Sequence, residues 1–140
     1  DEQPATQILN EEGDPIPQFV VDPVNYGRYL VYVEMLEALD AQEVATMFRE
    51  NEPLIEQAFD QLGYPEGNFE DRLLAVIDEL LATPELQEPP RLIKPEANYL
   101  YADETLESLS AGQKVLLRMG PDNARRVKAK LREIRAALSG

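Results

Sequence analysis

The most constraining stretch of the chain is residues 108–138, which predict two helices that meet at a sharp corner. Ser110 and Gln113 have the spacing of a capping box, in which the serine oxygen and the glutamine side chain each satisfy an unpaired backbone amide. Gly120 can adopt the left-handed conformation that ends a helix, and Pro121 suits the first turn of the next one. The direction of the chain at this point is therefore strongly encoded.

The second of these helices has the clearest periodicity in the protein. Its apolar residues recur at spacings of 3, 4, 3 and 4 and form one narrow stripe: Ala124, Val127, Leu131, Ile134 and Leu138. The stripe is shorter than the roughly three to four heptads that indicate a coiled coil, so packing on a core is preferred over a free coiled-coil seam. Cations are predicted to occupy the rest of the helix surface: Arg125, Arg126, Lys128, Lys130, Arg132 and Arg135.

Charge is distributed very unevenly along the chain. Residues 1–111 carry 5 basic and 25 acidic side chains, a net charge of −20, whereas residues 112–140 carry 8 basic and 2 acidic ones, a net charge of +6. The basic helix is predicted to neutralise acidic groups within its own fold, and the alternative is that it faces an acidic partner. Binding to nucleic acid is disfavoured because the whole chain, at −14, repels another polyanion.

The composition excludes most familiar catalytic chemistry. The chain has 140 residues, no histidine and no cysteine, which removes the commonest general base, the commonest metal ligand and thiol catalysis. No glycine-rich phosphate loop or zinc signature is present, and the clustered acids, such as Glu52, Glu56 and Asp60, are expected on solvated helix faces. We therefore predict no enzyme, no catalytic residue, no metal site and no cofactor.

The remaining patterns predict an all-α fold. Residues 1–18 have the composition of a flexible acidic linker or tail, and residues 19–140 are expected to form a single helical domain. The predicted fold is a compact bundle of about six helices, with a proline-rich extended strap (residues 83–101) between helices 4 and 5. Helix starts are expected at Asp22, Asp40, Pro53, Asn68, Asp103 and Ser110, with a turn at residues 64–67.

The apolar faces of these helices predict which side chains lie in the core of the protein. The helix of residues 68–81 has the broadest apolar face and is expected to be the buried central helix. The helix that follows Asp22 is also expected to be central, with Val31, Tyr32 and Met35 widening its buried face, and Met47 is expected to point inward from the next helix. No apolar run approaches the roughly 20 residues that span a bilayer, so the chain as given is expected to be soluble.

Several short blocks resemble a known bacterial family. They are PL…A…LGYP from Pro53, LLATP from Leu80, LESLS from Leu106, and QK…LLRMGP…NA from Gln113. This pattern is similar to an uncharacterised Gram-negative family called domain of unknown function 3014, over residues 19–138. The resemblance implies a membrane-tethered domain of the cell envelope, on the periplasmic face of the inner membrane, with residues 1–18 as the end of the tether. It implies no activity and no catalytic residues.

Three functional hypotheses follow from the sequence. The first is a non-catalytic interaction module, monomeric or weakly dimeric, that binds another envelope protein through the corner (residues 119–123) and the basic helix. The second is a small-ligand or glycan site in a groove between the first helix and the strap, lined by Tyr26, Tyr29, Tyr99 and Tyr101. The third, nucleic-acid binding, ranks last. The residues assigned to the interaction surface are Arg118, Met119, Asp122, Asn123, Arg125, Arg126 and Lys130.

Overall fold

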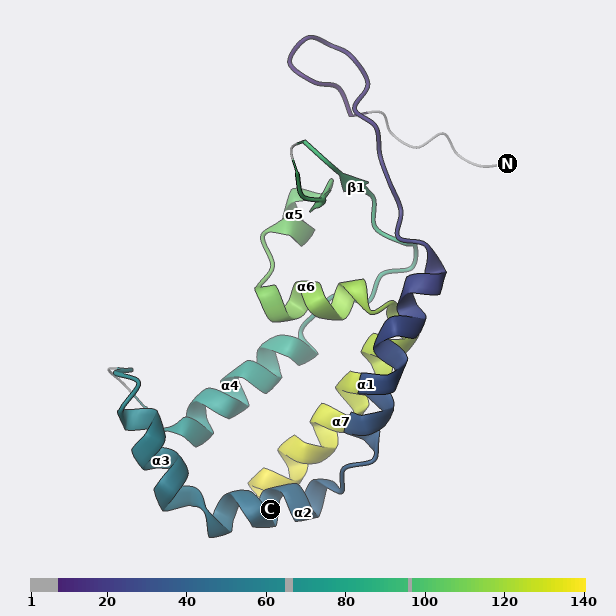
Figure 1. The fold of residues 1–140 in the computed structure, drawn as a ribbon. Helices are drawn as coiled ribbons and strands as arrows, with labels where there is room; N and C mark the ends of the chain where they lie inside the picture. Colours follow the sequence, from purple (N-terminus) through teal and green to yellow (C-terminus); the bar gives the residue numbers. More distant parts are fainter. Residues whose placement is uncertain (1–7, 65–66, 96) are drawn as a thin grey trace.

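The computed structural model describes residues 8–64, 67–95 and 97–140, and within them the chain is mostly helical (Figure 1). This confirms the predicted all-α bundle and the extended strap between its fourth and fifth helices. A two-stranded antiparallel sheet is the only regular β-structure in the described part. The elements are η1 (Pro23–Tyr26), α1 (Gly27–Glu37), α2 (Ala41–Glu50), α3 (Glu52–Asp60), α4 (Phe69–Leu81), β1 (Leu92–Ile93), β2 (Leu100–Tyr101), α5 (Glu104–Glu107), α6 (Ala111–Arg118) and α7 (Pro121–Ser139).

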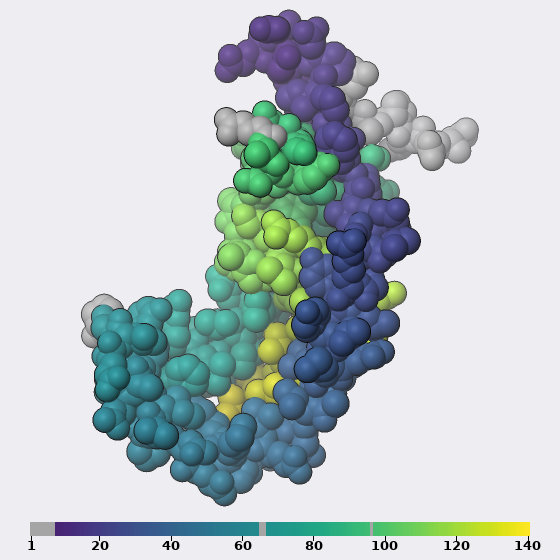
Figure 2. Space-filling model, in the orientation of Figure 1, coloured from purple at the N-terminus to yellow at the C-terminus, as the bar shows by residue number. Residues whose placement is uncertain are grey.

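Helix α7 is the central element of the bundle. It packs against α1, α2, α4 and α6, and Figure 2 shows only a narrow strip of it between α4 on one side and α1 and α2 on the other. The predicted apolar stripe faces the core: Val127 packs with Val33 and Leu116, and Leu138 packs with Ala45 and Phe48. The expectation that α4 is the central helix is therefore wrong. Helix α4 contacts α3, α6 and α7 and contains one buried residue, Ile77, whereas α7 contacts four helices and contains five buried residues.

Two lysines of α7 lie inside the protein, although the sequence placed them on its outer surface. Lys128 is 3% and Lys130 is 8% exposed. The Lys128 ammonium donates to the Thr83 carbonyl, just after α4 ends, and the Lys130 ammonium donates to the Leu39 carbonyl, just after α1 ends, at 2.6 Å. A lysine can bury its apolar stem and still extend its charge to a polar partner. The carbonyls at a helix C-terminus lack intrahelical partners and carry partial negative charge, so they suit a cation.

Arg49 makes the equivalent contact at the end of α7 itself. Its guanidinium donates to the Leu138 carbonyl and forms a two-pronged pair with Glu70 of α4, at 2.8 and 2.9 Å. One side chain of α2 thus ties together α4 and the last turn of α7. Three helix ends are held in this way by cations from neighbouring helices, which explains how an acidic chain uses its few positive charges.

The corner has the geometry that its residues predict. Both hydrogen bonds of the Ser110–Gln113 capping box are present, and Gly120 has φ of +90°, the left-handed region that favours glycine. A Cβ atom at Gly120 would lie 2.7 Å from the ring of Tyr26. The Asn123 amide donates to the Tyr26 and Met119 carbonyls, both at 2.9 Å. The corner is therefore locked against the start of α1.

The strap contains a short β-pairing. Strand β1 pairs with β2 in the register Leu92↔Tyr101. On the other edge of β1, Phe19 and Leu92 exchange two backbone hydrogen bonds of 2.8 and 2.7 Å. The segment before η1 is thereby attached to the sheet, which lies beside α5 and α6 (Figure 1).

The predicted linker lies only partly within the described residues. From residue 8 onward it forms a small turn, in which the Ile16 amide donates to the Ile8 carbonyl and the Asn10 side chain accepts from two backbone amides. Residues 1–7 lie outside the described residues, as do residues 65–66 of the predicted turn at 64–67. The flexibility of this linker stays a prediction. No helix in the part of the chain that the structure describes is long and apolar enough to cross a membrane.

Several residues expected in the core are instead exposed. Helix α1 has apolar side chains all round its circumference, and α7 covers only the face that carries Val33. Helix α3 lies at the edge of the bundle (Figure 1), where its main packing partners are α2 and α4. The exposed side chains are Val31, Tyr32, Met35, Met47, Leu54 and Leu62.

The buried ammonium of Lys128 provides a test of this packing. The variant Lys128→Met keeps the apolar stem of the side chain but leaves the Thr83 carbonyl without its donor. We therefore expect the free energy of unfolding to fall by about 1–3 kcal/mol. The matched control is Arg132→Met, an exposed position on the same helix, for which we expect a change within about 0.5 kcal/mol. Chemical denaturation measures both, and equal effects would contradict the capping role.

Candidate functional site

The residues assigned to the interaction surface do not form one free surface. Asn123 is only 7% exposed and holds the corner, while Met119 packs against the cluster of Val33, Leu116 and Val127. These two side chains therefore contribute to the packing of the corner.

The cations of the basic helix are mostly paired within the protein. Six of the eight basic residues in the segment 112–140 form an ion pair with an acidic side chain of the described chain; Arg118 and Arg132 do not. The longest-range pairs join α7 to its neighbours: Arg126 binds Glu37 of α1, and Arg135 binds Asp78 of α4 at 2.6 Å. Hydrogen bonds from these arginines hold the pKa of each carboxyl below its usual range.

Three of the four tyrosines from the groove hypothesis line one cavity. Tyr29, Tyr99 and Tyr101 surround a space of about 430 Å³ between the start of α1, the strap and the end of α6. The fourth, Tyr26, lies in a different cavity beside the corner. Arg118, which the sequence assigned to the interaction surface, lines the tyrosine cavity instead. The structure thus joins residues from two separate hypotheses in one site.

The elements around this cavity fix where its side chains lie. The Asp22 carboxylate accepts from the Val24 amide and starts η1, which leads into the first turn of α1 with Arg28 and Tyr29. On the opposite side, the Tyr101 amide donates to the Glu107 carboxylate at 2.8 Å, and Lys114 binds the same carboxylate at 3.2 Å. These contacts hold the pKa of Glu107 below its usual range and attach β2 to α5 and α6.

Tyr101 is the most buried side chain of the cavity. Burial raises the pKa of its hydroxyl, and the neighbouring Arg118 guanidinium opposes this effect without cancelling it. The hydroxyl donates to the Lys114 carbonyl over 3.4 Å, which is a long and therefore weak hydrogen bond. It remains protonated at neutral pH, as a polar group at the inner wall of the cavity.

Tyr99 forms the outer wall. It is half exposed, its ring meets the Phe19 ring edge-on with the centroids 5.4 Å apart, and the Lys94 ammonium lies 5.0 Å from its centroid. The Phe19 ring, in the segment that precedes η1, thus packs against the Tyr99 ring.

The charge of the cavity is opposite to that of the protein. Two arginines, Arg28 and Arg118, line it, and none of the described residues that line it is acidic, in a chain whose net charge is −14. Sequence reasoning missed Arg28, Asn25 and Asn98. Their only signal was spacing, because Asn25 and Arg28 lie within one turn of Tyr29, and Asn98 precedes Tyr99.

The pair between Arg126 and Glu37 predicts a specific pH dependence. A carboxyl whose pKa is lower in the folded state contributes stability above its unfolded pKa, near 4.3, and loses it as the pH falls through the folded value. We expect Arg126→Gln to lower the midpoint of thermal unfolding by about 2 °C at neutral pH, as for an exposed ion pair. The difference from the unchanged protein should vanish as the pH falls through the lowered pKa of Glu37.

The control for this measurement is Arg132→Gln, which removes an exposed cation from the same helix. It should leave the midpoint of thermal unfolding nearly unchanged at every pH. A pH-independent loss of stability in Arg126→Gln would show that the pairing with Glu37 is not its cause.

Comparison with known proteins identifies the family. Neither the curated proteins nor the solved structures contain a match to the chain. A family model described as "Protein of unknown function (DUF3014)" matches residues 4–135, which include most of the segment that the sequence assigned to the linker. Since the match covers nearly all of the chain and confirms the resemblance found in its sequence blocks, the chain belongs to this family of unknown function.

Proposed function

We propose that this domain is a non-catalytic binding module for a small anionic ligand that contains a sugar or aromatic ring. The observation that carries the proposal is a cavity in a strongly acidic protein whose described lining includes two arginines, three tyrosines and no acidic side chain. A cleft lined by one sign of charge raises the local concentration of oppositely charged ligands. Two arginines in one cavity therefore favour an anionic ligand there, even though the whole protein is acidic.

The two arginines supply the charge recognition. Arg28 comes from the first turn of α1, and Arg118 from the last turn of α6, so the cavity lies between cations on different elements. A planar guanidinium binds a carboxylate or phosphate through two parallel hydrogen bonds. Neither arginine forms an ion pair with an acidic side chain in the described chain. Arg118 does interact with the Tyr101 hydroxyl and with the Glu107 carboxylate. A guanidinium has five N–H donors, so Arg118 can keep these contacts and still bind a ligand.

The tyrosines and asparagines supply the contacts for the rest of the ligand. Tyrosine offers a broad apolar face and one polar tip, which suits a ring that carries hydroxyl groups. Asn25 and Asn98 add amide donors and acceptors at the edge of the cavity. A few polar groups that converge on an aromatic surface are typical of small-molecule sites. A sugar acid combines all of these features.

The location that accompanies this proposal comes from the family resemblance. We propose that the domain works at the periplasmic face of the inner membrane, attached through a tether that ends in residues 1–18. An anionic sugar of the cell envelope would be available to the cavity in that setting.

The second candidate is binding to another envelope protein through the corner and the basic helix. One observation favours it: Asp122 and Arg125 are exposed and pair with each other, three residues apart, so both can change partners at little cost. It has less support than the cavity, because Arg126 and Lys130, which were also assigned to that surface, are held by Glu37 and the Leu39 carbonyl.

Titration with glucuronate, followed by NMR, tests the proposed function. We expect glucuronate to shift the ring signals of Tyr29, Tyr99 and Tyr101, and glucose to shift them much less, since glucose lacks the carboxylate. The variant Arg118→Gln removes one of the two cations of the cavity, so it should raise the Kd for glucuronate about tenfold. The matched control is again Arg132→Gln, which changes the net charge equally but lies outside the cavity.

The outcome of the controls decides between the candidates. If Arg118→Gln and Arg132→Gln weaken glucuronate binding equally, the effect is one of net charge and the cavity has no specific role. If no tyrosine signal moves, the anionic-ligand proposal is wrong and the protein-binding surface becomes the leading candidate.

A further inference from the structure

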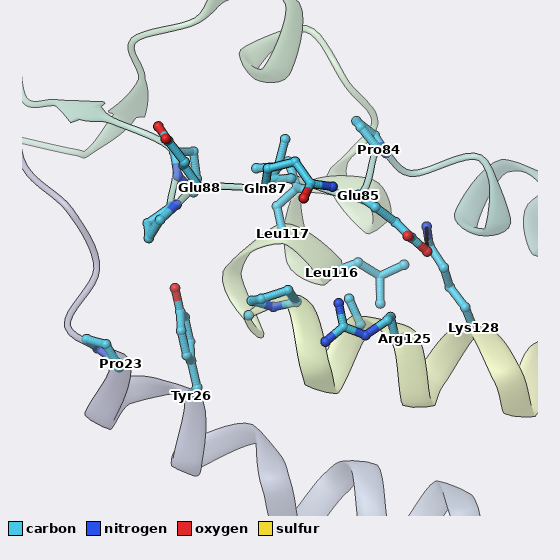
Figure 3. Close-up of a pocket in the computed structure, with 16 residues that line it drawn as sticks. Pro23, Tyr26, Pro84, Glu85, Gln87, Glu88, Leu116, Leu117, Arg125 and Lys128 are labelled. Atoms are coloured by element: carbon cyan, nitrogen blue, oxygen red, sulfur yellow. Dashed lines mark ion pairs between the residues drawn. The ribbon is translucent and has the colours of Figure 1, made fainter. Parts of the chain in front are cut away.

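A second cavity lies between the strap and the corner, and the proposed function does not use it. Its volume is about 140 Å³. Figure 3 shows that the strap passes over it from Pro84 to Glu88, with Tyr26 on one side and α7 below. Most of its lining is apolar. The apolar and aromatic lining residues include Tyr26, Leu86, Leu116, Leu117, Pro121 and Ala124.

The size and polarity of this cavity limit what it can hold. An apolar protein cavity of about 150 Å³ stays dry and takes up benzene in an unrelated protein. The present cavity is of that size and is partly open to solvent. The ligand group that fits is therefore apolar and about as large as a benzene ring.

One charged group extends into the cavity from α7. Figure 3 shows the Arg125 guanidinium directed towards the space beneath the strap. Its partner within the protein is Asp122, and this pair is exposed, with 55% of the Arg125 side chain and 87% of the Asp122 side chain accessible. An exposed pair of this kind contributes little to stability, so Arg125 can exchange Asp122 for a ligand carboxylate.

The other charged side chains of the cavity do not compete for this role. The Lys128 ammonium is buried, donates to the Thr83 carbonyl and lies 3.9 Å from the Glu85 carboxylate. Glu88 directs its carboxylate away from Arg125 in Figure 3. Among the described lining residues, Arg125 is thus the one cation that a ligand can reach from solvent.

We propose that this cavity binds a small carboxylate attached to a benzene-sized apolar group. The apolar group occupies the space between Tyr26, Leu116 and Leu117, and the carboxylate binds the Arg125 guanidinium at the edge. This site is separate from the tyrosine cavity, because the two share no lining residue.

Phenylacetate is the probe that tests this site. Titration into the protein, monitored by the methyl signals of leucine, is expected to shift Leu116 and Leu117. The neutral analogue 2-phenylethanol keeps the ring and loses the charge, so its Kd should be about fivefold higher. Arg125→Gln should raise the Kd for phenylacetate by the same factor and leave the Kd for 2-phenylethanol unchanged.

Two matched variants test whether the effect of Arg125→Gln is specific to this cavity. Arg132→Gln removes an exposed cation of the same helix, and Arg118→Gln alters only the tyrosine cavity; both should bind phenylacetate like the unchanged protein. The proposal is overturned if phenylacetate moves neither methyl pair at about 20 mM, well above a millimolar Kd. It is also overturned if Arg125→Gln binds normally, or if Arg118→Gln weakens binding as much as Arg125→Gln does.

Discussion

The structure depends on buried ammonium groups that meet the ends of neighbouring helices. Lys128 and Lys130 lie on α7 beside its apolar stripe, and their charges reach the carbonyls of Thr83 and Leu39. A buried charge without a partner is very unfavourable, and so is a buried carbonyl without a donor. Each contact removes both penalties at once. It therefore fixes where α4 and α1 end relative to α7.

The same contacts position the candidate site. The strap begins at Thr83, where Lys128 binds, and it leads to β2, where Glu107 holds the Tyr101 amide. Tyr29 and Arg118 reach the cavity from α1 and α6, which both pack on α7. Much of the positive charge of the basic helix is consumed in holding this arrangement. The two arginines at the tyrosine cavity, Arg28 of α1 and Arg118 of α6, form no ion pair with an acidic side chain among the described residues.

The sequence predicted those parts of the fold that local chemistry determines. The caps at Ser110 and Asn68, and the left-handed conformation of Gly120, follow from interactions within a few residues, and the structure contains them. The central role of α7 and the burial of Lys128 could not be predicted in this way. They depend on where distant helices end, and a cation on a helix surface has the same local sequence signal whether it meets solvent or a carbonyl.

The sequence predicted some residues of the candidate site but not their assembly, because the assembly also depends on distant contacts. Tyr29, Tyr99 and Tyr101 stood out as aromatic residues near the strap, but their assembly with Arg118 depends on the β1–β2 pairing and on the corner. Tyr26 was assigned to the same groove because it lies one turn before Tyr29. In the structure its ring packs over Gly120, the residue whose missing side chain makes room for it.

Hydrogen–deuterium exchange of the full chain tests the central role of α7 most directly. Amides in elements that open only on global unfolding exchange slowest. We predict that the amides of residues 127–138 are the slowest in the protein, and that those of α3, at the edge of the bundle, exchange much faster. If the amides of α4 were protected more strongly than those of α7, the bundle would be organised around α4, and the account given for the buried lysines would be wrong.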